Sequence, residues 1–90
     1  MTYFTKNPPF VQVVERNGEE YKDYWCPERT GDRETDLRTG KSYAEHFLAN
    51  VEEDEIGNTL SWIVGQQFAS GRFGHVEKGF IKRIADNIAI

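Results

Sequence analysis

The chain has 90 residues, which suffice for a single domain, 1–90, around one hydrophobic core and leave no room for a second. Its 15 acidic and 11 basic residues give a net charge of −4, which disfavours nucleic acid as the main partner. No apolar run approaches the roughly 18 residues that span a bilayer, and a single cysteine allows no internal disulfide, so we expect a cytoplasmic protein without a membrane segment.

The first part of the chain predicts an extended arm followed by a β-hairpin. Pro8-Pro9 disfavours regular pairing, so we expect residues 1–9 to form an extended N-terminal arm. The segments FVQVVER and EEYKDYWC flank Asn17-Gly18, the dipeptide most typical of a two-residue turn. This turn predicts a hairpin over about 10–26, in which the numbers of opposed residues sum to 35.

The predicted register has consequences for both faces of the hairpin. On one face it places Phe10 opposite Trp25, so an aromatic pair closes the open end. On the other face it places Glu15 opposite Glu20, and because like charges repel, we expect that end to remain in water. An isolated hairpin is only marginally stable, so we expect this one to pack against helices.

After Pro27 the apolar residues recur with helical spacing and predict a helix over about 33–50. Gly40 lies in the middle of the apolar face, where it either allows another backbone to approach closely or ends the helix. The segment 42–45, Ser-Tyr-Ala-Glu, also matches a capping box, which would start the helix later and leave Gly40 in a loop. We favour the longer helix because it places Leu37 on the core face.

Two further helices are predicted over about 54–70 and 75–89. In the second helix a later start at Asn58 is an alternative, since Asn is a favourable N-cap. The expected core residues of these two helices are apolar and recur every three or four positions: Ile56, Leu60, Ile63, Val64, Phe68, Val76, Phe80, Ile84 and Ile88. The predicted fold is therefore α+β, with an N-terminal β-hairpin packed against three α-helices.

Asp32, Glu34 and Asp36 alternate as the acids do in the first half of a calcium-binding loop. The later positions where such a loop needs Gly and Glu hold Leu37 and Tyr43 instead. We interpret the acids as the start of a helix, where negative charge suits the helix dipole. We therefore expect no metal site, and no motif in the chain predicts a cofactor.

Cys26 is expected at the end of the second strand. A nucleophilic cysteine needs a nearby histidine or helix N-terminus to lower its pKa, and nothing in the sequence brings His46 or His75 close to it. No catalytic motif occurs, and a small domain with one core rarely forms a concave active site. We expect a structural thiol and a protein that is not an enzyme; a small enzyme that uses Cys26 or a histidine is the third hypothesis.

The Gly71–Gly74 turn between the second and third helices suggests nucleic-acid binding. A Gly-x-x-Gly loop clamps RNA in KH domains, but these need further strands that are not predicted here. In a helix-turn-helix the third helix would be the recognition element. Its possible basic face comprises Arg72, Lys78, Lys82 and Arg83. Asp86 is expected to pair with Lys82, and the first 64 residues carry 13 acids and 7 bases, so we favour a solvated helix face.

Trp62 points away from the apolar side of the second helix and lies near Gly65 and Ala69, whose small side chains allow another element to approach. Large aromatic residues are mostly buried, so we first expect the hairpin to cover this face. The alternative is an exposed anchor for a partner or for a homodimer.

These features favour a small non-enzymatic protein-interaction or regulatory module that binds another protein or itself, with Trp62 as a possible contact. The alternative is a nucleic-acid-binding protein that uses the second helix, the Gly71–Gly74 turn and the basic face of the third helix.

Overall fold

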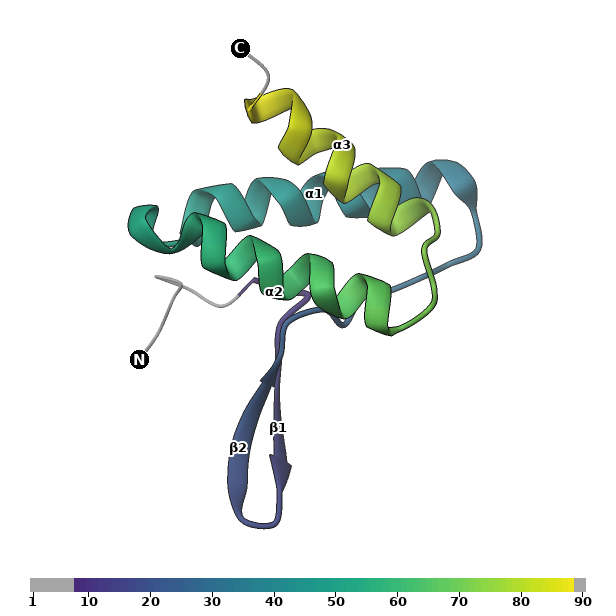
Figure 1. The fold of residues 1–90 in the computed structure, drawn as a ribbon. Coiled ribbons are helices and arrows are strands. Elements are labelled where there is room, and N and C mark those ends of the chain that lie inside the picture. Colours follow the sequence, from purple (N-terminus) through teal and green to yellow (C-terminus); the bar gives the residue numbers. More distant parts are fainter. Residues whose placement is uncertain (1–7, 89–90) are drawn as a thin grey trace.

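The computed structural model describes residues 8–88, so residues 1–7 of the predicted arm and residue 89 of the third helix lie outside the described part. The elements follow in the order β1 (Gln12–Arg16), β2 (Glu19–Asp23), α1 (Arg33–Asn50), the 3-10 turn η1 (Glu53–Glu55), α2 (Ile56–Ala69) and α3 (His75–Ile88). One antiparallel hairpin followed by three helices confirms the predicted α+β class (Figure 1).

The hairpin has the predicted turn and register. Asn17 and Gly18 both have positive φ, 52° and 80°, which is the conformation of a type I′ turn and matches the twist of the strands. The opposed residues sum to 35, and Glu15 lies opposite Glu20. Both glutamates are exposed, as like charges at opposed positions require.

The strands are shorter than predicted because the open end of the hairpin turns into the core. Beyond the ladder the Cys26 N–H still donates to the Phe10 carbonyl at 2.7 Å. The ring centroids of Phe10 and Trp25 are 5.3 Å apart, and both side chains are buried. The rest of the hairpin projects away from the helices (Figure 1). The prediction that the hairpin packs on helices therefore holds for its base alone.

α1 follows the longer of the two predicted alternatives. Asp32 is its N-cap, and the Asp32 carboxylate accepts the Thr35 N–H at 3.0 Å. Gly40 therefore lies inside the helix. An ideal Cβ on Gly40 would be 2.0 Å from the Val76 carbonyl oxygen of α3, so the glycine is required by a close approach of two helix backbones.

α1 and α3 form the central pair of the fold. Gly79 of α3 makes the reciprocal approach, since a Cβ there would be 2.3 Å from the Leu37 carbonyl oxygen of α1. Side chains of this pair and of the hairpin base surround one core. The buried core residues are Phe10, Trp25, Tyr43, Ala44, Phe47, Ile63, Val76, Phe80 and Ile84.

α2 contributes one residue, Ile63, to that core. Its buried residues are Thr59, Ile63 and Gln67, and the predicted core residues Ile56 and Leu60 are partly buried and pack against the core. The predicted apolar side also included Phe68. That part of the prediction was wrong, because Phe68 is 70% exposed. α1 and α3 already cover most of each other's core residues, so only a narrow strip of α2 is buried against them.

Candidate functional site

α2 differs from the other two helices in having no charged residue. α1 contains six charged residues and α3 contains five, whereas the α2 sequence IGNTLSWIVGQQFA contains none. A helix at the surface normally carries charged or polar residues on the side that faces water. Because only three residues of α2 are buried, most of this uncharged helix is exposed.

Trp62 lies on the exposed side of α2 and is 38% exposed. The Tyr24 ring, just beyond β2, lies 5.3 Å from it between centroids. The hairpin base thus covers one side of Trp62, and the other side remains open. Beside it the small residues Gly65 and Ala69 line a shallow depression of about 410 Å³. A Cβ on Gly65 would meet no atom within 4 Å, so the space above the helix is empty there.

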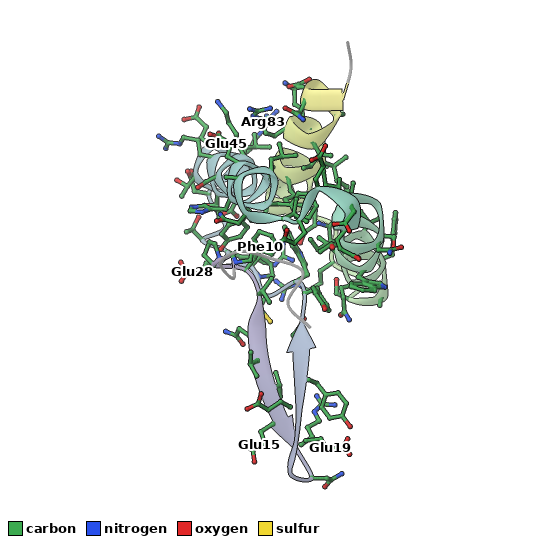
Figure 2. The ribbon with its side chains drawn as sticks, turned by 90° about the vertical axis from the view of Figure 1, so that its left-hand side faces the viewer. Phe10, Glu15, Glu19, Glu28, Glu45 and Arg83 are labelled. Carbon is green, nitrogen blue, oxygen red and sulfur yellow. The ribbon has the colours of Figure 1, made fainter. Side chains whose placement is uncertain are left out.

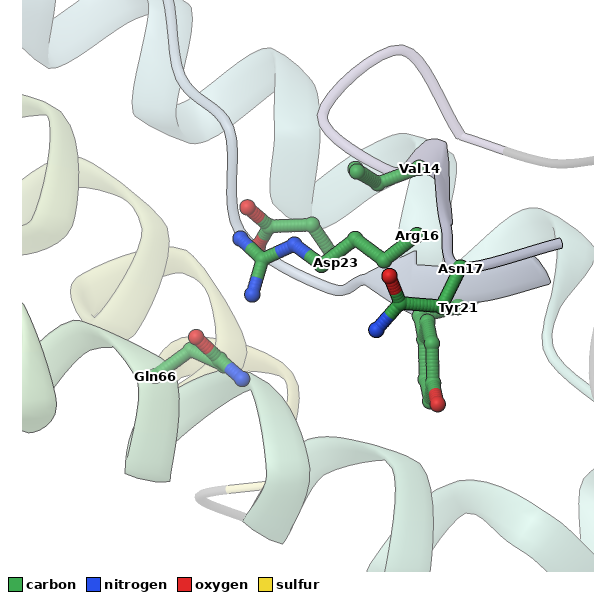
Figure 3. A pocket seen from close by; sticks show the side chains of 6 residues that line it. All are labelled: Val14, Arg16, Asn17, Tyr21, Asp23 and Gln66. Carbon is green, nitrogen blue, oxygen red and sulfur yellow. The ribbon is translucent and has the colours of Figure 1, made fainter. Parts of the chain in front are cut away.

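This depression adjoins a cleft between α2 and the hairpin, and Gln66 lines both. The cleft encloses about 530 Å³, and its hairpin wall contains Val14, Arg16 and Tyr21. Figure 3 shows the Gln66 side chain on α2 and the side chains of the hairpin wall across the cleft from it. We call the joined surface the α2–hairpin cleft. Its residues are Val14, Arg16, Asn17, Tyr21, Asp23, Tyr24, Ser61, Trp62, Gly65, Gln66 and Ala69.

An exposed aromatic pair lies at the C-terminal end of α2. The Phe68 and Phe73 rings are stacked, with centroids 6.1 Å apart and planes 15° apart. Phe73 is 45% exposed. This pair was not predicted from the sequence, because the helical spacing assigned Phe68 to the core. The sequence feature that could have indicated an exposed aromatic residue here was Phe73 within the Gly71–Gly74 turn.

Three of the four predicted basic residues line depressions in the structure. Lys82 and Arg83 line a groove of about 350 Å³ between α1 and α3, together with Arg38 and Lys41 of α1. Arg72 lines a different depression, near the start of α3. The Lys82 Nζ and a carboxylate oxygen of Asp86 are 3.6 Å apart, so the expected pair forms. The two α1 residues were not predicted, because only packing places them beside α3.

Glu77 is a fully buried acid in the first turn of α3. Its carboxylate accepts the Trp25 indole N–H at 2.8 Å and the Gly74 N–H at 2.8 Å, and it pairs with both terminal nitrogens of Arg29. Burial alone would raise the pKa of Glu77, but the hydrogen bonds from Arg29, Trp25 and Gly74 outweigh it and lower the pKa to about 2. This cluster joins the hairpin base to α3 and serves packing, since all its acceptors are occupied by the chain itself.

The acids at the start of α1 act as the helix interpretation predicted. Asp36 is buried and accepts the Thr30 N–H at 2.9 Å, the Thr30 hydroxyl at 2.8 Å and the Gly31 N–H at 3.2 Å. The hydrogen bonds from Thr30 hold the pKa of Asp36 below its usual range. Within residues 8–88, no group of three or more His, Cys, Asp or Glu side chains is arranged to hold a metal ion.

Cys26 is partly buried at the hairpin base. Burial raises the pKa of its thiol to about 11, and a hydrogen bond with Asp23 and the charge of that carboxylate act in the same direction. At neutral pH the thiol is therefore protonated, whereas a nucleophile or metal ligand needs the thiolate.

No protein-family model matches the chain, and no curated protein or solved structure matches it either. Among the helices of the described residues, none is both long and apolar enough to cross a membrane. The surfaces of the molecule are therefore the basis on which a function can be proposed.

Proposed function

We propose that the protein is a non-enzymatic interaction module of the cytoplasm and that the α2–hairpin cleft binds another protein. The observation that carries this proposal is that α2 is largely exposed and yet uncharged. Charged residues are depleted at the centres of protein interfaces, so α2 itself presents no charge for a partner to desolvate, and the charges of the cleft, Arg16 and Asp23, lie on its hairpin wall.

The composition of the cleft supports the same function. Tyr and Trp supply much of the binding energy at interface centres, and here Tyr21 lines the cleft while Tyr24 and Trp62 line the depression that adjoins it at Gln66. The small residues Gly65 and Ala69 leave room for the backbone of a partner. α2 is about 21 Å long and the strands are about 17 Å long, so a partner helix or strand could follow either wall.

A pair of glycine substitutions tests this proposal without disturbing the fold. Gly65→Glu places a charge in the open space of the cleft, and Gly57→Glu places the same charge on the same helix outside the cleft; neither Cβ meets an atom within 4 Å. A photo-crosslinking amino acid at Gln66 identifies the bound protein in cells. We expect Gly65→Glu to abolish the crosslink and Gly57→Glu to preserve it, while both variants keep the circular dichroism of the unsubstituted chain.

A crosslink that survives Gly65→Glu, or that appears equally from a crosslinker at Asn50 on the far end of α1, would contradict the proposal. Such a result would mean that proteins contact the surface without docking in the cleft.

The nucleic-acid alternative has weaker support. It needs Arg72, Lys78, Lys82 and Arg83 on one face, but Arg72 and the pair Lys82–Arg83 line different depressions. α3 also lies along α1, with the reciprocal glycines of the two helices in contact, and not against α2 as its partner in a helix-turn-helix. We therefore propose protein binding. The nucleic-acid alternative stays a prediction, which a DNA- or RNA-binding assay at low salt would test.

A further inference from the structure

A cationic groove lies between α1 and α3, on a surface separate from the α2–hairpin cleft. Arg38 and Lys41 line one wall and Lys82 and Arg83 the other, with one acid, Asp86, also present. Four cations and one anion give the groove a formal charge of +3 in a chain whose net charge is −4. Leu37 and Gly79 complete the lining, so the charges surround an apolar floor.

The hairpin tip carries the opposite charge. The last two paired positions before the turn hold three glutamates and one arginine, a formal charge of −2: Arg16 lies opposite Glu19, and Glu15 lies opposite Glu20. Two like charges opposed across strands destabilise a hairpin. An isolated hairpin has little stability to lose, so this arrangement is unfavourable unless cations approach the tip.

The tip and the groove lie at opposite ends of the molecule. Figure 2 shows Glu15 and Glu19 at the free end of the hairpin and Arg83 on the helices at the other end, and the molecule is 39 Å along its longest axis. A chain therefore cannot place its own hairpin tip in its own groove. We propose that the hairpin tip of one copy docks into the α1–α3 groove of a second copy.

The two surfaces match in more than charge. Val13 lies on the same face of the hairpin as Glu15 and Glu20 and is 52% exposed, so it can cover Leu37 on the groove floor while these two glutamates meet the cations. Docking also relieves the repulsion between Glu15 and Glu20. Because the hairpin is a projecting arm, its tip can enter a groove that a flat surface could not reach.

A second copy fits the groove better than nucleic acid does. The lining contains no aromatic residue on which a base could stack. The remainder of the chain carries a formal charge of −7, which is −4 minus +3, and a long polyanion would be repelled by it. A short acidic hairpin avoids this repulsion, because only its tip needs to approach.

The contact joins two different surfaces, so it is heterologous and each copy retains one free tip and one free groove. Such contacts build open chains of increasing length unless the rotation between copies closes a ring. Because the contact is electrostatic and solvent-exposed, it weakens as salt screens the charges. The proposal does not depend on the α2–hairpin cleft and uses none of the residues that test it.

Sedimentation of the full chain over a range of protein concentrations, at about 20 mM and about 300 mM salt, measures this association. We expect assemblies larger than a monomer at low salt and dissociation at high salt. Lys82→Glu with Arg83→Glu should weaken association at least about tenfold, and so should Glu15→Lys with Glu20→Lys. A chain that stays monomeric at low salt and high concentration would overturn the proposal.

A matched control separates docking from the effect of net charge. Arg72→Glu with Lys78→Glu changes the charge by the same amount as the groove variant, but these residues do not line the groove. We expect this control to associate within about threefold of the unsubstituted chain. Equal weakening by the control and the groove variant would overturn the proposal.

Charge exchange gives the sharpest test. A chain that carries both the groove and the tip substitutions has a groove of formal charge −1 and a basic tip, so it should associate more tightly than a chain that carries either pair of substitutions alone. Failure of this chain to associate while it remains folded would contradict docking. Nucleic-acid binding is measured with a labelled single strand of about 20 nucleotides. If the original chain binds this strand without self-association, and only the groove variant loses the binding, the groove is a nucleic-acid site instead.

Discussion

The α1–α3 pair and α2 are built on opposite principles. α1 and α3 carry eleven charged residues between them and meet through two reciprocal glycine contacts, so their inner faces are tightly matched and their outer faces suit water. α2 has no charge, buries a strip of three residues that includes the polar Thr59 and Gln67, and exposes Trp62 and Phe68. The pair supplies six of the nine buried core residues, whereas α2 supplies only Ile63.

The glycines show the same contrast. Gly40 and Gly79 are in contact with the backbone of the opposite helix, while a Cβ added at Gly57 or Gly65 in α2 would have no atom within 4 Å. A glycine inside a helix lowers the stability of the helix. Gly57 and Gly65 have no packing partner that requires a glycine, which is consistent with a role of α2 other than stabilising the fold. Four substitutions, two in each region, test this contrast.

The largest effect is expected from Gly40→Ala. The added Cβ would lie 2.0 Å from the Val76 carbonyl oxygen, and because that atom belongs to a helix backbone, the two helices must move apart. We expect the free energy of unfolding to fall by about 3 kcal/mol or more. Urea denaturation followed by circular dichroism measures it, and a loss below about 1 kcal/mol would show that the α1–α3 contact adjusts easily.

The next effect concerns the pH dependence that Glu77 confers on the pair. Its pKa is about 2 in the folded protein against an ordinary value of 4.5, so its contribution is complete above about pH 5 and is lost as the pH falls towards 2. The difference corresponds to about 3 kcal/mol. We expect Glu77→Gln to be less stable at neutral pH. Its free energy of unfolding, measured between pH 6 and 2, should fall less with decreasing pH than that of the original chain. The lowered pKa values of Asp32 and Asp36 leave a residual slope.

An acid dependence as steep in Glu77→Gln as in the original chain would show that other carboxylates are responsible. That result would leave the proposal for the α2–hairpin cleft unchanged, because Glu77 does not line the cleft.

A smaller effect of the opposite sign is expected in α2. Gln67 is fully buried, and among the described residues neither of its side-chain polar atoms has a hydrogen-bond partner. Gln67→Met keeps the volume and removes the unpaired amide, so we expect the free energy of unfolding to rise by about 1–2 kcal/mol. Gln66→Met on the exposed side is the control, with a change within about 0.5 kcal/mol. A thermal midpoint that falls in Gln67→Met would show that the amide is needed.

The smallest effect completes the glycine comparison. Gly65→Ala adds a methyl group where no atom is near and removes backbone freedom from the unfolded chain, so we expect a stabilisation of about 0.5–1 kcal/mol. The same denaturation experiment compares it with Gly40→Ala. A destabilisation by Gly65→Ala would indicate that α2 packs more closely than the described contacts show.

Local signals in the sequence were sufficient for the secondary structure. Asn17-Gly18 predicted both the turn type and the register, since a two-residue loop leaves one way to pair the strands. The span 33–50 for the first helix is confirmed, and Asp32 caps it. The second helix was predicted as one element, whereas its first residues form η1, and Glu55, with φ −109° and ψ 3°, separates η1 from α2.

The candidate sites were predictable in part. Trp62 was recognised as unusual because it lies off the apolar side of its helix, and the structure places it at the junction of α2 and the hairpin. The contribution of Arg38 and Lys41 to the groove was not predictable, because they lie about 40 residues from Lys82 and Arg83. Periodicity also misplaced Phe68, since it gives the apolar side of a helix and not the width of the strip that neighbours cover.

The sequence by itself therefore determined the hairpin and the helices, because turn conformation, capping and periodicity act over a few residues. The absence of charge from α2 can also be read directly from the sequence. Packing determined which side of each element is covered. Gly40 illustrates the division: its position in a helix was predictable, but only the approach of Val76 from α3 shows why no side chain is tolerated there. The same holds for Glu77, an ordinary acid in the sequence that becomes a buried anchor once the fold brings Arg29 and Trp25 to it.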